Sequence, residues 1–178
     1  FLHVDNHWVW INGLEIHTGI NFTTEGVIDP FNISGITVDP GTYNHSEAQL
    51  VLMTNASKMF YVNTRSILGG SFGGTRYLNS GTLGFRVGDK FNSEYSVAIN
   101  DLRLPNGSTV STLLGARLSY SFTPRINFQG FVQYNSFAEL WSLNLRFSIL
   151  EQANTGLFIV YNDIYTYEEP NNRSFIIK

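Results

Sequence analysis

The sequence predicts an all-β protein, an up-and-down antiparallel β-barrel whose strands cross a membrane. Three observations lead to this fold class: hydrophobic and polar residues alternate with a period of two over long segments, tight turns recur between these segments, and aromatic residues gather near the segment ends. About eleven such strands can be distinguished. We expect residues 1–178 to be a single β-barrel region, incomplete because the chain is a fragment of a longer protein.

The composition agrees with a surface that faces lipid. Of the 178 residues, 43% are hydrophobic and only 14% are charged, whereas soluble domains carry about a quarter charged residues. The net charge of −3 and the lack of a basic block argue against a nucleic-acid partner. The sequence contains no cysteine, which excludes disulfides and thiolate metal sites. No stretch approaches the roughly 18 apolar residues of a membrane-spanning helix.

The alternation is clearest from Val110 to Phe122, where even positions are apolar and odd positions are mostly Ser, Gly or Arg, with Leu113 as the exception. The same pattern runs through residues 14–22, 91–100, 126–135 and 141–149. Such segments have about 9–13 residues, which is longer than most soluble strands and close to the length that a tilted strand needs to cross a bilayer. We therefore expect these strands to be transmembrane.

Short and long connections alternate between the predicted strands. Tight turns are expected at residues 12–13, 55–57, 89–90, 123–125 and 152–155. Longer polar connections are expected at residues 23–41, 69–75, 101–109, 136–140 and 164–172. Outer-membrane barrels have short turns on the periplasmic side and longer loops outside, so the pattern predicts that the chain lies in the bacterial outer membrane.

The predicted strands carry charged and amide side chains on their polar faces, which we expect to line the lumen. These residues are Arg65, Arg86, Glu94, Arg117, Gln129, Gln133 and Arg146. In a closed lumen they would pair with one another, because an isolated buried charge is costly. In an open lumen the arginines would bias a channel toward anions. We favour the paired network over the channel.

Aromatic residues on the predicted apolar faces form a candidate girdle at the membrane interfaces, where amphipathic rings are favoured. They are Trp8, Trp10, Tyr120, Phe122, Phe128, Tyr134 and Trp141. The alternative fold is a water-soluble antiparallel sandwich or lipocalin-like barrel, whose apolar face would turn inward. The polar faces carry few lysines, and this favours the membrane barrel over a soluble exterior.

We predict no catalytic site and no cofactor. His3, Asp5 and His7 share one strand face and are a weak candidate for a metal site, although no fourth ligand is evident nearby. Glu151 and the adjacent Glu168 and Glu169 are candidate acids, since paired carboxylates can hydrolyse glycosides. A solvated loop explains the adjacent pair better.

Five segments resemble a known bacterial family. They are Ile36-Thr-Val-Asp-Pro-Gly-Thr-Tyr43, Leu118-Ser-Tyr-Ser-Phe-Thr-Pro-Arg125, Phe128-Gln-Gly-Phe-Val-Gln-Tyr-Asn135, Gly156-Leu-Phe-Ile-Val-Tyr-Asn162 and Arg173-Ser-Phe-Ile-Ile-Lys178. They are similar to a C-terminal outer-membrane β-barrel domain of unknown function. That domain follows a domain like the family-9 carbohydrate-binding modules in Bacteroidetes-type and related Gram-negative bacteria. The resemblance covers about four-fifths of the chain.

The resemblance implies an outer-membrane anchor or pore that contacts outer-membrane lipid and lipopolysaccharide. In the full-length protein it would carry a glycan-binding domain, so a glycan would bind through the upstream domain, which this chain lacks. Two alternatives stay open: a porin-like solute channel with an arginine-lined lumen, and the barrel part of a glycoside hydrolase-like protein. The family also continues beyond the position of Lys178 with an aromatic-rich ending, which this chain lacks.

Overall fold

The computed structural model describes residues 1–152, 155–166 and 172–178, where all regular structure is β-strand. The strands are β1 (Leu2–Val9), β2 (Glu15–Val27), β3 (Phe31–Ile33), β4 (Ile36–Val38), β5 (Gly41–Met53), β6 (Phe60–Ser71), β7 (Gly74–Val87), β8 (Phe91–Leu104), β9 (Gly107–Thr123), β10 (Ile126–Asn135), β11 (Leu140–Gln152), β12 (Thr155–Thr166) and β13 (Asn172–Ile177). No helix in these ranges is long and apolar enough to cross a membrane. The all-β prediction is confirmed.

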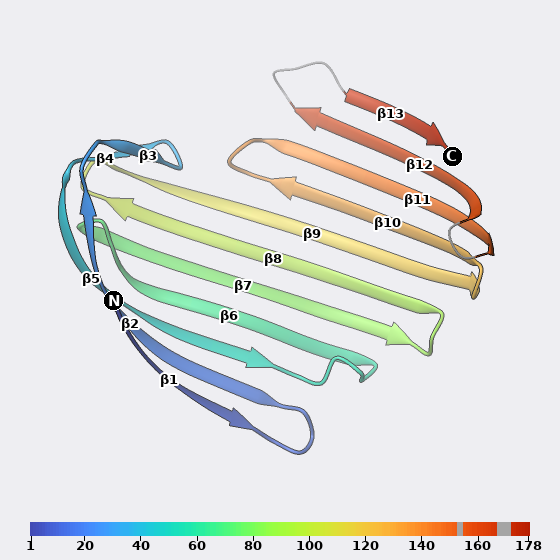
Figure 1. The fold of residues 1–178 in the computed structure, drawn as a ribbon, viewed down its shortest axis with the longest axis horizontal. Helices are drawn as coiled ribbons and strands as arrows, with labels where there is room; N and C mark the ends of the chain where they lie inside the picture. Colours follow the sequence, from blue (N-terminus) through green and yellow to red (C-terminus); the bar gives the residue numbers. More distant parts are fainter. Residues whose placement is uncertain (153–154, 167–171) are drawn as a thin grey trace. The chain divides into compact units, whose positions relative to one another are not determined.

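Eleven of the described strands form one antiparallel sheet in the order β1-β2-β5-β6-β7-β8-β9-β10-β11-β12-β13, and β3 pairs with β4 in a second sheet (Figure 1). Neighbours in the large sheet follow one another along the chain, apart from the inserted β3–β4 hairpin. The predicted up-and-down topology is therefore confirmed, whereas the hairpin was not predicted. Within the described residues no ladder joins β1 to β13. The transmembrane barrel stays a prediction.

Contacts divide the chain into two compact units. The first unit contains residues 1–55, 62–81 and 98–111, and the second contains residues 56–61, 82–97 and 112–178. Parts of β6, β7, β8 and β9 belong to each unit. The predicted site residues therefore fall into two groups, one in each unit.

In the second unit, strand pairing places the alternating hydrophobic and polar residues on two different faces of the sheet. Tyr134 of β10 lies opposite Trp141 of β11, while Phe131 lies opposite Arg117 of β9. Because successive side chains of a strand point to opposite faces, Tyr134 and Trp141 share one face, and Arg117, Phe131 and Gln129 share the other. We name these the apolar face and the polar face of the second unit.

The first unit shows the same division. Val4 of β1 lies opposite Ile20 of β2, and the next pair along the ladder is His3 with Asn21. Asn21 in turn lies opposite Glu47 of β5. Val4 and Ile20 thus mark the apolar face of the first unit, and His3, Asn21 and Glu47 mark its polar face.

The long connection predicted at residues 69–75 is wrong. β6 runs on to Ser71 and β7 begins at Gly74, which leaves a two-residue turn. Its residues, Phe72 (φ 43°) and Gly73 (φ 79°), both have positive φ, as in the type I′ turns that match the twist of paired strands. The glycines favoured a loop in the sequence, but here they allow close pairing of strands.

The connection predicted at residues 101–109 is also too long, since only Pro105 and Asn106 separate β8 from β9. Residues 23–41 are not an irregular loop either, because β2 continues to Val27 and the β3–β4 hairpin follows. The loop at residues 136–140 is confirmed in outline, with residues 136–139 between β10 and β11. The elements predicted at 152–155 and 164–172 include residues outside the described ranges.

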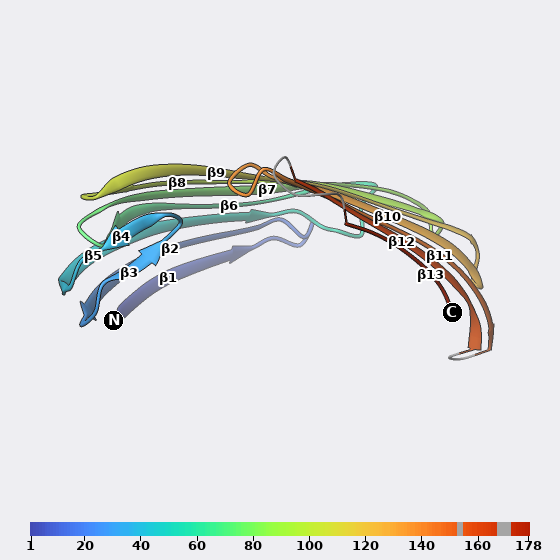
Figure 2. The same ribbon diagram turned by 90° about the horizontal axis from the view of Figure 1, so that it is seen from above.

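A small apolar core joins the β3–β4 hairpin to β8 in the first unit. Figures 1 and 2 show where this hairpin lies. The buried members of the core are Ile36 and Val38 of β4 with Leu102 and Leu104 of β8. Val27, Ile33, Tyr43 and Phe72 pack against it. Outside this cluster, Tyr61 and Ile67 are the other hydrophobic side chains that are buried in the part of the chain that the structure describes. Most of the apolar surface of the sheet is therefore uncovered.

Gly69 sits where β6 approaches β5 too closely for any side chain. A Cβ atom there would lie 2.2 Å from the carbonyl oxygen of Ser46 and 2.4 Å from the Cα of Glu47. Gly69→Ala should therefore lower the free energy of unfolding by about 1–3 kcal/mol, because the two backbones must separate. Urea unfolding of the refolded protein in detergent measures this loss.

Gly26→Ala in β2 is the matched control, since a Cβ atom there meets nothing within 4 Å. It should leave the midpoint of unfolding unchanged or slightly raise it. Equal effects of the two substitutions would contradict the close approach of β5 and β6.

Candidate functional site

The polar face of the second unit carries two arginines stacked on aromatic rings. The guanidinium carbon of Arg117 lies 5.1 Å from the centroid of the Phe131 ring, directly across the β9–β10 ladder. Arg146 lies 5.1 Å from the centroid of the Phe158 ring on β12. Both arginines are exposed, and neither forms an ion pair with a carboxylate in the described residues. The Phe131 and Phe158 rings thus position two guanidinium groups that no carboxylate among the described residues neutralises.

Amide and hydroxyl side chains fill the same face between these arginines. Gln129 lies opposite Arg146, and Gln133 lies opposite Ser142. Further along the sheet, the Asn144 side-chain amide donates a hydrogen bond to Asn162, which donates to the Ser174 hydroxyl at 3.0 Å. This row crosses β11, β12 and β13, so polar side chains form hydrogen bonds with one another across strands.

A buried tyrosine anchors the Glu94 region of the second unit. The Tyr61 hydroxyl donates a hydrogen bond to Glu94 Oε1. The Tyr61 ring covers Gly84, where a Cβ atom would lie 2.0 Å from ring carbons. Arg86 is exposed two residues further along β7. The sequence analysis identified Glu94 and Arg86 but missed Tyr61, because an aromatic residue on a polar face looks like a break in the alternation.

In the first unit, the predicted Arg65 donates a hydrogen bond from Nη2 to Gln49 Oε1 at 2.8 Å. A second arginine, Arg76, was not predicted. Its Nη1 lies 3.9 Å from Glu47 Oε1, and its Nε lies 3.4 Å from Asn100 Oδ1. Arg76 directly follows residues 69–75, which were predicted as a loop, so the sequence pattern did not assign it to the polar face of a strand.

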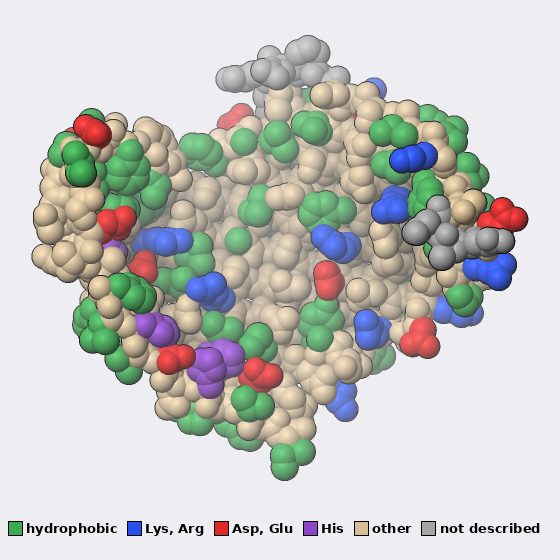
Figure 3. All heavy atoms as spheres, in the orientation of Figure 1, with side chains coloured by type: hydrophobic (Ala, Val, Ile, Leu, Met, Phe, Trp, Pro, Cys, Tyr) green, Lys and Arg blue, Asp and Glu red, His purple; other side chains and the backbone are tan. Residues whose placement is uncertain are grey.

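Figure 3 shows histidine and acidic side chains together on the face in view, over the first strands of the sheet. The Asp5 carboxylate lies 2.8 Å from His7 Nε2 and 3.7 Å from His3 Nε2. The rings of His7 and His17 stack with centroids 3.9 Å apart, and His17 Nε2 lies 3.2 Å from Glu15. The structure thus brings the three predicted residues together as a row in which Asp5 lies between the two histidines.

This row does not have the geometry of a metal centre. Among the described residues, no group of three or more His, Cys, Asp or Glu side chains is placed to hold a metal ion. His3, Asp5 and His7 therefore lie on a polar strand face, and the described residues add no support to the weak metal candidate that they form. Side chains spaced two apart on one extended strand spread along a line instead of converging on a point.

The predicted girdle residues lie on the apolar faces or beside them. Tyr134 and Trp141 pack with ring centroids 4.7 Å apart, and Tyr120 meets Phe122 edge-on at 4.8 Å. Phe128 lies opposite Tyr120 in the β9–β10 ladder. Trp8 lies on the apolar face of β1 opposite Ile16, and Trp10 is exposed in the β1–β2 connection.

One ion pair on the apolar face of the second unit was not predicted. Asp163 lies opposite Leu143, and its Oδ2 accepts hydrogen bonds from Arg173 Nε at 3.2 Å and from the Tyr161 hydroxyl at 3.0 Å. Of the candidate acids, Glu151 is exposed in β11, while Glu168 and Glu169 lie outside the described residues.

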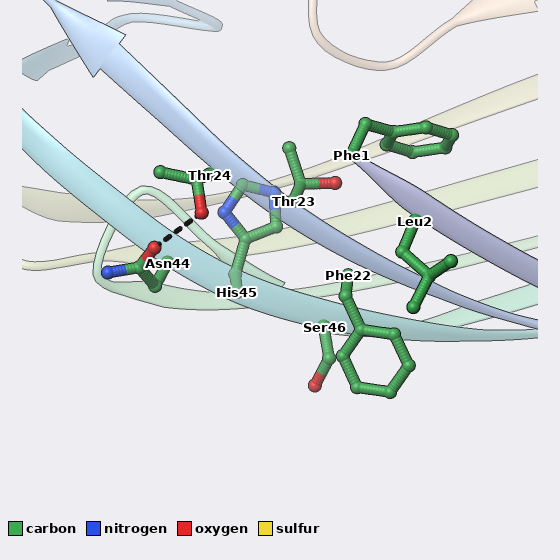
Figure 4. A pocket seen from close by; sticks show the side chains of 8 residues that line it. All are labelled: Phe1, Leu2, Phe22, Thr23, Thr24, Asn44, His45 and Ser46. Carbon is green, nitrogen blue, oxygen red and sulfur yellow. Dashed lines mark hydrogen bonds between the residues drawn. The ribbon is translucent and has the colours of Figure 1, made fainter.

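Figure 4 shows a pocket of the first unit, at the step where β1 begins while β2 and β5 continue. Within it, Thr24 donates a hydrogen bond to Asn44 at 2.7 Å, and the Nδ1 atom of His45 is buried without a partner. Thr23 and Thr24 are adjacent in β2 and therefore belong to opposite faces of the sheet. The pocket is a notch in a strand edge and does not gather one set of side chains around a ligand.

Comparison of the sequence and the fold with protein-family models, curated proteins and solved structures finds no match. The resemblance to the C-terminal outer-membrane barrel domain therefore stays a prediction.

Substitutions of Tyr61 separate its two contacts. Tyr61→Phe keeps the ring over Gly84 but leaves Glu94 without its donor, and should lower the free energy of unfolding by about 1.5–3 kcal/mol. Tyr61→Ala also removes the ring, and should cost about 3–5 kcal/mol. Urea titration of both variants measures the difference. A Tyr61→Phe variant as stable as the parent would contradict a structural role for the hydrogen bond.

Proposed function

We propose that this chain is a segment of a bacterial outer-membrane β-barrel, in which it acts as a membrane anchor or pore. The observation that carries the proposal is the uncovered apolar face of the sheet. In the second unit, Trp141 is 44% exposed, Ile149 38% and Leu157 41%, and Ile149 and Leu157 are paired across one ladder. A continuous apolar surface of this kind is unfavourable in water, whereas hydrocarbon is a medium in which it is stable.

The lengths of the strands support the same proposal. β5 to β12 have 10 to 17 residues each. A tilted transmembrane strand needs about 9–11 residues to cross the hydrocarbon core. Most strands of soluble sheets are shorter. β5 to β12 are therefore long enough to span a bilayer, and all of them except β10 have residues left over at the interfaces.

The hydrogen bonds on the polar faces support the proposal that these faces line the lumen of the barrel. Their side chains bond to one another across strands, as in the row of Asn144, Asn162 and Ser174 and in the Arg65–Gln49 pair. Under this proposal the apolar faces contact lipid and lipopolysaccharide. A glycan-binding domain elsewhere in a longer protein is a further expectation, which rests on the sequence resemblance alone.

Leu113 and Leu114 offer a matched test of which face meets lipid. They are neighbours in β9, they have similar exposures of 38% and 43%, and they lie on the polar and apolar faces respectively. Leu114→Arg should lower the free energy of unfolding in lipid vesicles by about 1 kcal/mol, because it places a charge on the lipid face close to the interface, where its partner Tyr134 lies. Leu113→Arg should have a much smaller effect, since its side chain faces the lumen.

Urea titration in vesicles measures both variants, and electrophoresis of unheated and boiled samples reports whether each folds. The folded parent should migrate differently before and after boiling. A soluble sheet would tolerate both substitutions equally, because both side chains are already exposed. The variants are made in the full-length protein, and equal stabilities, or a full-length parent without any mobility shift, would therefore exclude the membrane barrel.

A porin-like channel is the second candidate, favoured by two arginines that form no ion pair within the described residues. Arg117 and Arg146 lie on the polar face of the second unit, where Glu94 already bonds to Tyr61. A lumen lined by cations without counter-charges raises the local concentration of anions. This arrangement favours a solute pathway over a lumen that is closed by ion pairs.

Replacing both arginines tests the channel. The Arg117→Gln/Arg146→Gln double variant should lower the chloride-to-potassium permeability ratio toward unity, because two fixed positive charges leave the lumen. Reversal potentials across planar bilayers in a potassium chloride gradient measure this ratio. Arg173→Gln is the control, since Arg173 lies on the apolar face and should leave the ratio unchanged.

A further inference from the structure

The apolar core of the first unit lies on the polar face of the sheet and not on its apolar face. Asn100 belongs to the polar face, where it accepts a hydrogen bond from Arg76, the partner of Glu47. Leu102 and Leu104 follow at two-residue intervals in β8, so they share the face of Asn100. They are 1% and 8% exposed. The polar face thus becomes apolar at this end of β8.

The β3–β4 hairpin covers this apolar patch. In β4, Ile36 and Val38 are 6% and 3% exposed, whereas Thr37 between them is exposed. β4 therefore lays one side against the sheet and turns the other away from it. On β3, Phe31 meets Phe72 edge-on with ring centroids 5.3 Å apart. Phe72, in the β6–β7 turn, meets Tyr43 in the same way at 5.6 Å.

Hydrogen bonds fasten the hairpin to two other elements. The Asn106 side-chain amide, in the β8–β9 turn, donates to Asp39 Oδ2 at 2.7 Å and to the Thr37 carbonyl oxygen at 3.0 Å. The Tyr43 hydroxyl donates to the Asp39 carbonyl oxygen at 2.8 Å. At the tip, Ser34 (φ 50°) and Gly35 (φ 84°) form a tight turn. The hairpin is therefore held by hydrogen bonds at Thr37 and Asp39 and by the packing of Phe31, Ile36 and Val38.

We propose that the β3–β4 hairpin is a fixed constriction inside the barrel, which limits the size of solutes that pass along the polar face of the first unit. The inference rests on the proposed outer-membrane barrel. If the polar face lines the lumen, an element packed on that face occupies lumen space. A connection that served only to join β2 to β5 would need neither a buried core nor hydrogen bonds to the β8–β9 turn. Leu102 and Leu104 provide an apolar surface for Ile36 and Val38, and this packing keeps the hairpin in place.

Two variants remove or loosen the constriction. In the first, residues 29–39 are replaced by Gly-Ser-Gly, which should raise the single-channel conductance in potassium chloride at least about twofold, because pore diameter sets the flow of ions. The same variant should admit polyethylene glycols of larger size. In the second, Asn106→Ala removes both hydrogen bonds to the hairpin while the sheet stays paired, and should give a smaller rise with larger current fluctuations.

Asn135→Ala is the matched control. Asn135 Oδ1 accepts hydrogen bonds from the backbone of Phe137 and Ala138 in another connection, so the variant should leave conductance unchanged. The shift in mobility on boiling identifies correctly folded samples. If the replacement variant does not fold, Asn106→Ala decides the question alone.

The outcomes separate this inference from the proposed function. Folded variants whose conductance and polymer cut-off equal those of the parent would overturn the constriction while leaving the barrel intact. A parent that inserts into bilayers but conducts neither with nor without the hairpin would also overturn it. A parent that shows no mobility shift and no insertion would overturn the barrel itself.

Discussion

The register of antiparallel pairing determines on which face of the sheet each side chain lies. Successive residues of a strand point to opposite faces, so a register shift of one residue would exchange the two faces completely. In the second unit, such a shift would bring Gln133 or Gln129 to the face that carries Tyr134 and Trp141. Register therefore matters more to this chain than any single contact, because few side chains are buried deeply enough to stabilise the fold by packing.

The polar faces depend on the same register. Asn144 reaches Asn162 and Asn162 reaches Ser174 because these residues are direct partners in consecutive ladders. Arg117 stacks on Phe131 for the same reason. These side chains gain little individually, but each is satisfied only when its strand is in place. Hydrogen bonds between polar side chains thus favour one register of the strands, whereas contacts on the apolar face alone would permit several registers.

Much of the fold could be predicted from the sequence because period-two alternation is a local signal. Strands such as β9, β10 and β11 are visible in it, as is the turn at Pro124. The β3–β4 hairpin could not be predicted, since its three-residue strands are too short to show a period. Phe72 and Gly73 were hidden because a glycine-rich stretch indicates a loop unless the partner strand is known. Predicted Arg65, Arg117 and Arg146 lie on polar faces, whereas Tyr61 and Arg76 emerged only from pairing across strands.

The outermost strands have a consequence for how the chain would enter a bilayer. Within the described residues, β1 pairs only with β2 and β13 pairs only with β12. In hydrocarbon, each backbone N–H or C=O group without a partner costs several kcal/mol, which summed along one strand exceeds the net stability of a typical domain. A strand that entered lipid ahead of its neighbour would therefore be driven out again. In the proposed barrel, folding and insertion would then be a single cooperative event, governed by the pairing of strand edges and not by the hydrophobicity of any one segment.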